Sequence, residues 1–210
     1  MSGKTTLDKS LHSEKMEKEQ LEYSAILQQL SDEERAFIEK FTPVRKFKKG
    51  TVLLKEGQIS DTCYFNFKGC VRQYYLVNGE EKTTFFYTEG QSITSFESYT
   101  NRTPSKHYLE CIEDCELSVT TNETEKVMYQ RFPHFETLCR KEAEKALGEY
   151  QETLAKYITT SPEERYLNLV QNRPDLLNRV PQYQLASYLG IKPESLSRIR
   201  KRIAEKTKNS

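Results

Sequence analysis

The chain has 210 residues and a mass of 24.6 kDa, which is enough for one large domain or two small ones with a real core. Hydrophobic residues make up 36% and charged residues 30%, a balance typical of a folded globular protein rather than a disordered one. No stretch approaches the roughly eighteen consecutive apolar residues of a membrane span, and the start of the chain holds no apolar signal core. We therefore expect a cytoplasmic protein that does not contact a membrane.

The net charge of +1 conceals an asymmetry along the chain. From Lys192 to the end there are seven Lys or Arg and two Glu, which gives a local charge of +5 within nineteen residues. A basic end on a nearly neutral protein indicates a polyanionic partner for that end, although a solvated tail has the same composition.

The five cysteines form no Cys-x-x-Cys pair and are accompanied by three scattered histidines; they are Cys63, Cys70, Cys111, Cys115 and Cys139. A disulfide framework is not expected in a chain without an export signal. We interpret the cysteines as buried thiols and predict no metal site.

The first third of the chain changes character twice. Residues 1–20 are polar and are predicted to form a flexible extension. Apolar residues then recur at helical spacing over 21–41, and Ser31 with Glu34 three positions later fits a capping box, which places a helix start there. Pro43 closes that helix.

Residues 45–120 have the pattern of an antiparallel β-domain. Five of the eight glycines fall between positions 50 and 90 and separate the runs TVLL, CYFNF, VRQYYLV and KTTFFYT. Short strands divided by turn residues at this rhythm indicate a sandwich or barrel. Asn78-Gly79 predicts a type I′ hairpin, and YLECI and CELSVT continue the β-character to about residue 120.

Residues 123–158 return to a helical pattern that Pro133 interrupts. The second helix carries apolar residues at alternating steps of four and three, flanked by charges, and these are Ala143, Leu147, Tyr150, Leu154 and Tyr157. Such a narrow stripe favours pairing with a second copy of the chain, while packing on the chain's own β-domain remains the alternative. A seam this short needs other contacts to hold.

A second, all-helical domain is predicted from about residue 160. Ser161 is suited to an N-cap and Pro162 to the first helical position, with Glu163 and Glu164 in the first turn. Pro174 ends this helix.

The segment PQYQLASYLGIKPESLSRIRKR, residues 181–202, predicts a helix-turn-helix. Gly190 supplies the positive φ of a tight turn between two short helices, and Ala186 allows the helices to cross closely. Leu185, Leu189, Leu196 and Ile199 form the inner faces. An ordinary helical hairpin with a basic outer face is the alternative.

In a helix-turn-helix the second helix enters the major groove of DNA and its N-terminal residues meet base edges. We expect Glu194, Ser195 and Arg198 to read bases, since Arg can bind guanine and Glu can accept from cytosine. The phosphate contacts are assigned to Lys192, Ser197, Arg200, Lys201 and Arg202.

The chain resembles the Crp/Fnr superfamily of bacterial transcription regulators over residues 21 to about 205. The resemblance is carried by QLASYLGIKPESLSRIRK and by EGQISDTCYFNFKGCVRQYYLVNGEE, which is similar to the family's cyclic-nucleotide-binding β-roll. TTSPEERYLNLVQNRPDLLNRVPQYQLASYLGI is similar to versions common in Bacteroidetes.

The resemblance implies an α+β architecture in three parts. An antiparallel β-roll, of the double-stranded β-helix or jelly-roll kind, is expected at 21–130. A dimerisation helix is expected at 131–159, and a helix-turn-helix domain of winged-helix type at 160–210. Because the chain ends soon after the recognition helix, any wing must precede it, around residues 178–181, or be absent.

The chain departs from the family at the phosphate-binding positions of the β-roll. Family members that bind cyclic AMP use a Gly-Glu pair and, about ten residues on, an Arg-Ser pair. Here the Glu position is Ser95 and the Arg position is Ser105, with Lys106 adjacent and Gly90 upstream. Without the bidentate Arg the strongest contact to a phosphodiester is missing, although Lys106 or Arg102 could substitute. We predict no tight binding of cyclic AMP; the same roll could hold another small ligand or none.

Two other sensor chemistries of the family are not expected. No cysteine precedes Cys63, which argues against the iron–sulfur branch, and His107 is the only histidine in the roll and an unpromising haem ligand. In the recognition helix the family's common Arg is replaced by Pro193, so one base contact is lost.

These features predict a homodimeric, sequence-specific DNA-binding transcription regulator that acts on a near-palindromic operator, with RNA polymerase as a partner by resemblance. The alternative is a small-molecule sensor that acts through protein–protein contacts and carries a vestigial helix-turn-helix. No nucleophile elbow, phosphate loop or metal-ligand spacing indicates an enzyme.

Overall fold

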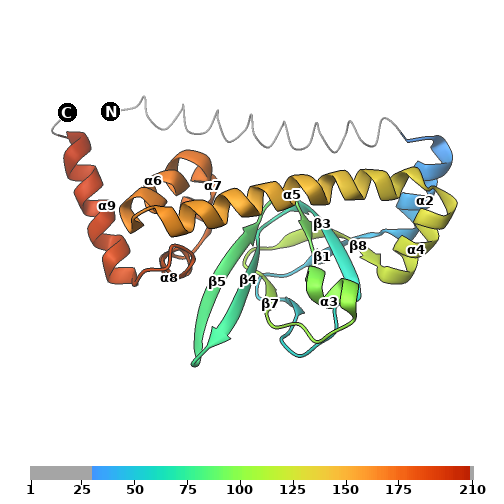
Figure 1. Ribbon diagram of the computed structural model, residues 1–210, viewed down its shortest axis with the longest axis horizontal. Helices are drawn as coiled ribbons and strands as arrows, with labels where there is room; N and C mark the ends of the chain where they lie inside the picture. Colours follow the sequence, from blue (N-terminus) through green and yellow to red (C-terminus); the bar gives the residue numbers. More distant parts are fainter. Residues whose placement is uncertain (1–29, 209–210) are drawn as a thin grey trace.

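The computed structural model describes residues 30–208. The predicted extension at 1–20, and the part of the first helical pattern before residue 30, lie outside the described residues. A long helix runs across the top of a β-roll, and a group of helices packs at its far end (Figure 1). The fold is the expected α+β arrangement of an antiparallel β-roll followed by helices.

The first described helix, α2 (Asp32–Phe41), begins where the capping box predicts. The Ser31 side chain accepts from the Glu34 amide, and the Glu34 carboxylate accepts from the Ser31 amide at 2.7 Å. Phe37 is buried against Met128 and Phe132, so this helix is attached to the helices that follow the β-roll.

The β-roll consists of two four-stranded antiparallel sheets. One sheet has the order β1-β8-β3-β6, with β1 (Val44–Phe47), β8 (Cys115–Thr121), β3 (Thr62–Lys68) and β6 (Ser92–Ile93). The other has the order β2-β7-β4-β5, with β2 (Val52–Leu54), β7 (Tyr108–Cys111), β4 (Val71–Val77) and β5 (Glu80–Tyr87). Inward-facing residues such as Ile93, Leu109 and Leu117 fill the space between the sheets and exclude water from it.

The hairpin between β4 and β5 turns at Asn78 and Gly79, whose φ angles of 54° and 80° fit the predicted type I′ turn. Four short elements were not anticipated from the sequence: β1, β6, helix α3 (Phe96–Asn101) and helix α7 (Pro174–Arg179). β1 is mostly exposed and polar, while β6 has two residues and α3 has six, too few to show a period.

Helix α4 (Asn122–Arg131) and the 26-residue helix α5 (His134–Thr159) are separated at Pro133, as predicted. Phe135 is the buried residue of α5, and most of its remaining length is exposed. A helix of this length with so little of its surface covered is held by the elements at its two ends and by the β-roll beneath it.

Four helices form the C-terminal group, here called the head domain: α6 (Pro162–Asn172), α7 (Pro174–Arg179), α8 (Gln182–Tyr188) and α9 (Pro193–Lys208). Ser161 caps α6 and forms a capping box with Glu164. Residues 160–208 contain no strand, so the wing considered around residues 178–181 is absent. The core of the head domain is continuous with β-roll residues Cys70, Phe86 and Ile112.

Candidate nucleic-acid interface and sensor pocket

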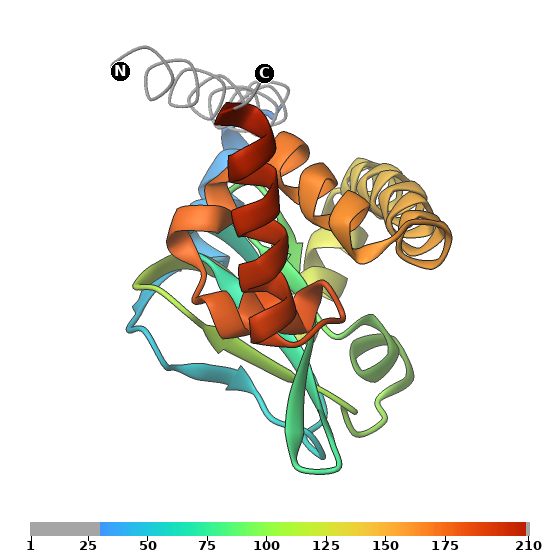
Figure 2. The same cartoon turned by 90° about the vertical axis from the view of Figure 1, so that its left-hand side faces the viewer.

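Helices α8 and α9 form the predicted helix-turn-helix. Gly190 lies between them with a φ of 69°, and the Ile191 amide donates to the Ala186 carbonyl at 3.0 Å. Ala186 is fully buried, so its small side chain lies where the two helices approach each other. Leu196 and Ile199 are buried on the inner side of α9. This packing leaves the opposite side of α9 facing outward (Figure 2).

The predicted base-reading residues lie near the N-terminus of α9. Glu194 and Arg198 are exposed, and Ser195 is half-buried. The residues to which the phosphate contacts are assigned are also exposed: Lys192, Ser197, Arg200, Lys201 and Arg202. Among them, Arg202 forms an ion pair with Glu163 of α6, while the described part of the chain supplies no ion pair for Arg198, Arg200 or Lys201. The outer side of α9 is therefore a cationic surface that other side chains neutralise only in part.

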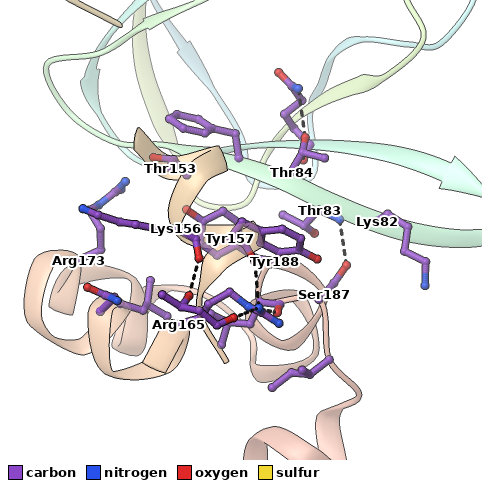
Figure 3. Close-up of a pocket in the computed structure, with 18 of the residues that line it drawn as sticks. Lys82, Thr83, Thr84, Thr153, Lys156, Tyr157, Arg165, Arg173, Ser187 and Tyr188 are labelled. Carbon is purple, nitrogen blue, oxygen red and sulfur yellow. Dashed lines mark hydrogen bonds between the residues drawn. The ribbon is translucent and has the colours of Figure 1, made fainter. Parts of the chain in front are cut away.

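An arginine that the sequence reasoning did not single out fixes the turn of this motif. Arg165 Nη1 donates to the carbonyls of Thr160, at 2.7 Å, and Tyr157, and its Nε donates to the Leu189 carbonyl at 3.1 Å. The guanidinium also lies over the Tyr157 ring, 4.7 Å from its centroid. One side chain thus joins the end of α5 to the end of α8 (Figure 3).

The predicted apolar seam of α5 is divided between two environments. Ala143, Leu147 and Leu154 are exposed, the last two by 58% and 60%. Tyr150 instead contacts the β-roll, where its hydroxyl lies 3.2 Å from that of Tyr87, and Tyr157 lies against Gly190. The aliphatic part of the seam is therefore without cover in the single chain, while the two tyrosines contact their own chain.

A cavity of about 1430 Å³ lies between β5, α5 and the head domain. Its walls include Thr83 and Thr84 of β5, Tyr157 of α5, and Ser187 and Tyr188 of α8 (Figure 3). The exposed Leu154 also lines it, so the cavity reaches the exposed side of α5.

The predicted sensor-pocket residues are only partly brought together. Ser95 and Ser105 are both buried with their hydroxyl oxygens 3.5 Å apart. Lys106 is exposed and pairs with Glu97 at 2.8 Å, and Arg102 donates to the Ser60 carbonyl at 3.0 Å. The two cations that could have replaced the missing arginine are therefore both engaged elsewhere.

Gly90, the fourth predicted pocket residue, belongs to the turn after β5, where its amide donates to the Asn66 carbonyl. His107, which adjoins Ser105, is 8% exposed and its ring centroid lies 5.3 Å from that of Tyr75. Its Nε2 has no hydrogen-bond partner among residues 30–208. Burial lowers the pKa of His107, which keeps the imidazole neutral. The chemistry around Ser95 and Ser105 is thus that of neutral polar groups.

The cysteines are all free thiols. Cys70, Cys111 and Cys115 are buried as predicted, whereas Cys63 is half-buried and Cys139 is exposed, so the prediction of buried thiols is wrong for Cys139. Within residues 30–208 no group of three His, Cys, Asp or Glu side chains is placed to hold a metal ion. Burial raises the pKa of Cys63 to about 12, so this thiol stays protonated at neutral pH. None of the helices in this part of the chain is both long and apolar enough to span a bilayer.

Residues 44–131 match the family of the cyclic nucleotide-binding domain. None of the curated proteins matches the chain.

Several solved structures share this fold at low sequence identity. The c-di-GMP responsive global regulator CLP of Xanthomonas campestris is 15% identical with a TM-score of 0.66, covering 84% of this chain and 93% of that one. A putative Crp/Fnr-family transcriptional regulator of Eubacterium rectale is 14% identical with a TM-score of 0.66, covering 86% and 87%. A CooA mutant of Carboxydothermus hydrogenoformans is 16% identical with a TM-score of 0.61, covering 80% and 78%. At these identities the likeness establishes the fold, which extends over the β-roll, the long helix and the head domain.

Proposed function

We propose that this chain is a sequence-specific DNA-binding transcription regulator of the Crp/Fnr type. The observation that carries the proposal is the cationic outer side of α9, supported from behind by α8 across Ala186 and Gly190. The match to the cyclic nucleotide-binding domain and the fold shared with regulators support it. The proposal includes a similarity of this chain to Bacteroidetes versions of the family, a cytoplasmic location and contact with RNA polymerase. It assigns the chain no catalytic activity.

The regulator acts as a homodimer in this proposal. Leu147 and Leu154 form the uncovered aliphatic part of α5, and a second copy of the helix is the partner whose pattern matches it. Two copies of α9 would then meet successive major grooves about 34 Å apart, which requires a near-palindromic operator.

The β-roll of this regulator does not use cyclic AMP. A phosphodiester needs a fixed cation. The hydroxyls of Ser95 and Ser105 form a hydrogen bond with each other, and the Lys106 ammonium is paired with Glu97. An effector held at Ser95 and Ser105 would be a neutral polar molecule.

Selection from a random-duplex library at two salt concentrations tests the function. We expect a palindrome whose half-sites lie one helical turn apart, bound with strong salt dependence. Arg198→Ala should weaken operator binding by about 1–3 kcal/mol and relax one base position per half-site. Lys201→Ala is the matched control, because a phosphate contact should weaken all duplexes alike. Equal weakening on operator and random duplex by Arg198→Ala would refute its base-reading role.

A further inference from the structure

The head domain is attached to the β-roll by an ionic cluster that the proposed function does not explain. Arg179, the last residue of α7, forms four hydrogen bonds to two carboxylates of the β-roll. Nη1 and Nη2 donate to Glu89 at 2.8 Å each, and Nε and Nη2 donate to Glu113 at 2.9 Å each. Both pairs are therefore bidentate, which is the geometry that fixes a guanidinium most firmly.

The three side chains are withdrawn from water. Their exposed fractions are 18% for Arg179, 9% for Glu89 and 27% for Glu113. Glu89 also accepts from the Gly69 amide at 2.8 Å, so its carboxylate has partners in both domains. The cost of removing these charges from water offsets much of their attraction, so the cluster adds little to stability. The planar guanidinium meets both carboxylates in one orientation, so the cluster fixes the direction of the head domain.

A second contact lies at the edge of the β-roll. β5 is the last strand of its sheet, and its open edge meets α8. The Thr83 amide donates to Ser187 Oγ at 2.9 Å, and Ser187 Oγ donates to the Glu81 carbonyl at 3.0 Å (Figure 3). A side chain of the first helix of the helix-turn-helix thus occupies the place of a neighbouring strand.

Hydrophobic burial does not account for the direction of the Arg179 and Ser187 contacts. Cys70, Phe86 and Ile112 already join the two domains through a shared core, and hydrophobic contact is non-directional. A forked arginine and a strand-edge hydroxyl define the rotation of the head domain about that core. Rotation matters for DNA reading, because a dimer reaches two half-sites only when both recognition helices have the required separation and direction.

We propose that Arg179 is a positioning residue for DNA recognition, holding the head domain on the β-roll through Glu89 and Glu113 in the orientation that sets half-site spacing. The proposal rests on the proposed DNA-binding function. A head domain released from this contact must be ordered again at each binding event, which lowers affinity for the correctly spaced operator. Binding to random duplex has no spacing requirement and should change little.

The first test compares Arg179→Met with Arg131→Met, which removes an exposed arginine paired with Glu33 away from the head domain. Because a buried and a half-buried carboxylate left without their partner can unfold the chain, the neutral variant R179M/E89Q/E113Q is measured beside it. Arg179→Lys serves as the conservative variant. Folding of each is checked by circular dichroism and thermal unfolding before binding is measured.

The readout is affinity for the selected operator and for versions with one to three base pairs inserted or deleted between the half-sites. We expect the neutral variant to bind the operator about tenfold more weakly and to lose most of its spacing preference, with random-duplex affinity unchanged. Arg179→Lys should restore part of the preference, and Arg131→Met should match the wild type. A folded neutral variant with wild-type affinity and spacing preference overturns the proposal, as does one that binds the operator more tightly.

Hydrogen exchange at the Thr83 amide provides a readout without DNA. This amide is bonded to Ser187 of the head domain, so it should exchange faster when the head domain moves away. Faster exchange in the neutral variant than in Arg131→Met supports the positioning role of Arg179, and equal exchange overturns it. If the wild type selects no operator, the DNA-binding function fails; faster exchange would then still establish the attachment of the domains.

Discussion

Replacing Gly190 with alanine tests whether the helix-turn-helix is fixed against α5. Gly190 has a φ of 69°, and an alanine there costs about 1–2 kcal/mol for the left-handed backbone. Its Cβ would also overlap the Tyr157 hydroxyl and lie 3.0 Å from Cζ of that ring. Moving Tyr157 disturbs its contact with the Arg165 guanidinium, worth about 0.5–1 kcal/mol. The sum predicts a loss of about 1.5–3 kcal/mol in the free energy of unfolding.

The matched control is Gly79→Ala. Gly79 has a φ of 80°, and no atom of the described residues lies within 4 Å of an added Cβ, so this variant isolates the backbone cost of about 1–2 kcal/mol. Urea unfolding at fixed protein concentration, followed by circular dichroism, gives both values. In a Tyr157→Phe background the hydroxyl is gone, and the cost of Gly190→Ala should fall toward that of Gly79→Ala. Equal costs for the two glycines, or no change in the Tyr157→Phe background, would refute the close approach of turn and helix.

Two further predictions concern the dimer and the contact between Glu89 and Arg179. Leu154→Glu places a charge on the exposed aliphatic part of α5. Sedimentation equilibrium should therefore show weaker dimerisation, while the thermal unfolding of the single chain is unchanged. An unaltered dimer would exclude this side of α5 as the interface. Burial opposes ionisation of Glu89, but hydrogen bonds from Arg179 and the Gly69 amide outweigh it and lower the pKa of Glu89 below its usual 4.5. The folded state thus favours the carboxylate, and its contribution to stability is present above about pH 4.5 and is lost as the pH falls through the lower folded pKa. Acid titration of unfolding should show this loss, and Glu89→Gln should reduce the slope below about pH 4.5; a slope equal to that of the wild type would exclude Glu89 as its source.

Local patterns along the chain were sufficient for most elements of this protein. The capping box at Ser31, the N-cap at Ser161, the turn at Asn78-Gly79 and the interruption at Pro133 all lie where the sequence predicts them. Each depends on the backbone preferences of one or two residues or on hydrogen bonds between residues three or four apart, so a short stretch of sequence is enough to predict it. The buried face of the helix-turn-helix is local in the same sense, because helical spacing alone selects its residues.

The tertiary structure alone decided which side chains meet across the two domains. Arg179 lies ninety positions from Glu89 and sixty-six from Glu113, and no periodicity connects them. The seam of α5 shows the same limit, since its spacing marks an apolar stripe but cannot say that the Tyr157 hydroxyl lies against Gly190. Contacts between distant segments depend on how complete helices and strands pack in three dimensions. The spacing of residues along the sequence does not predict that packing.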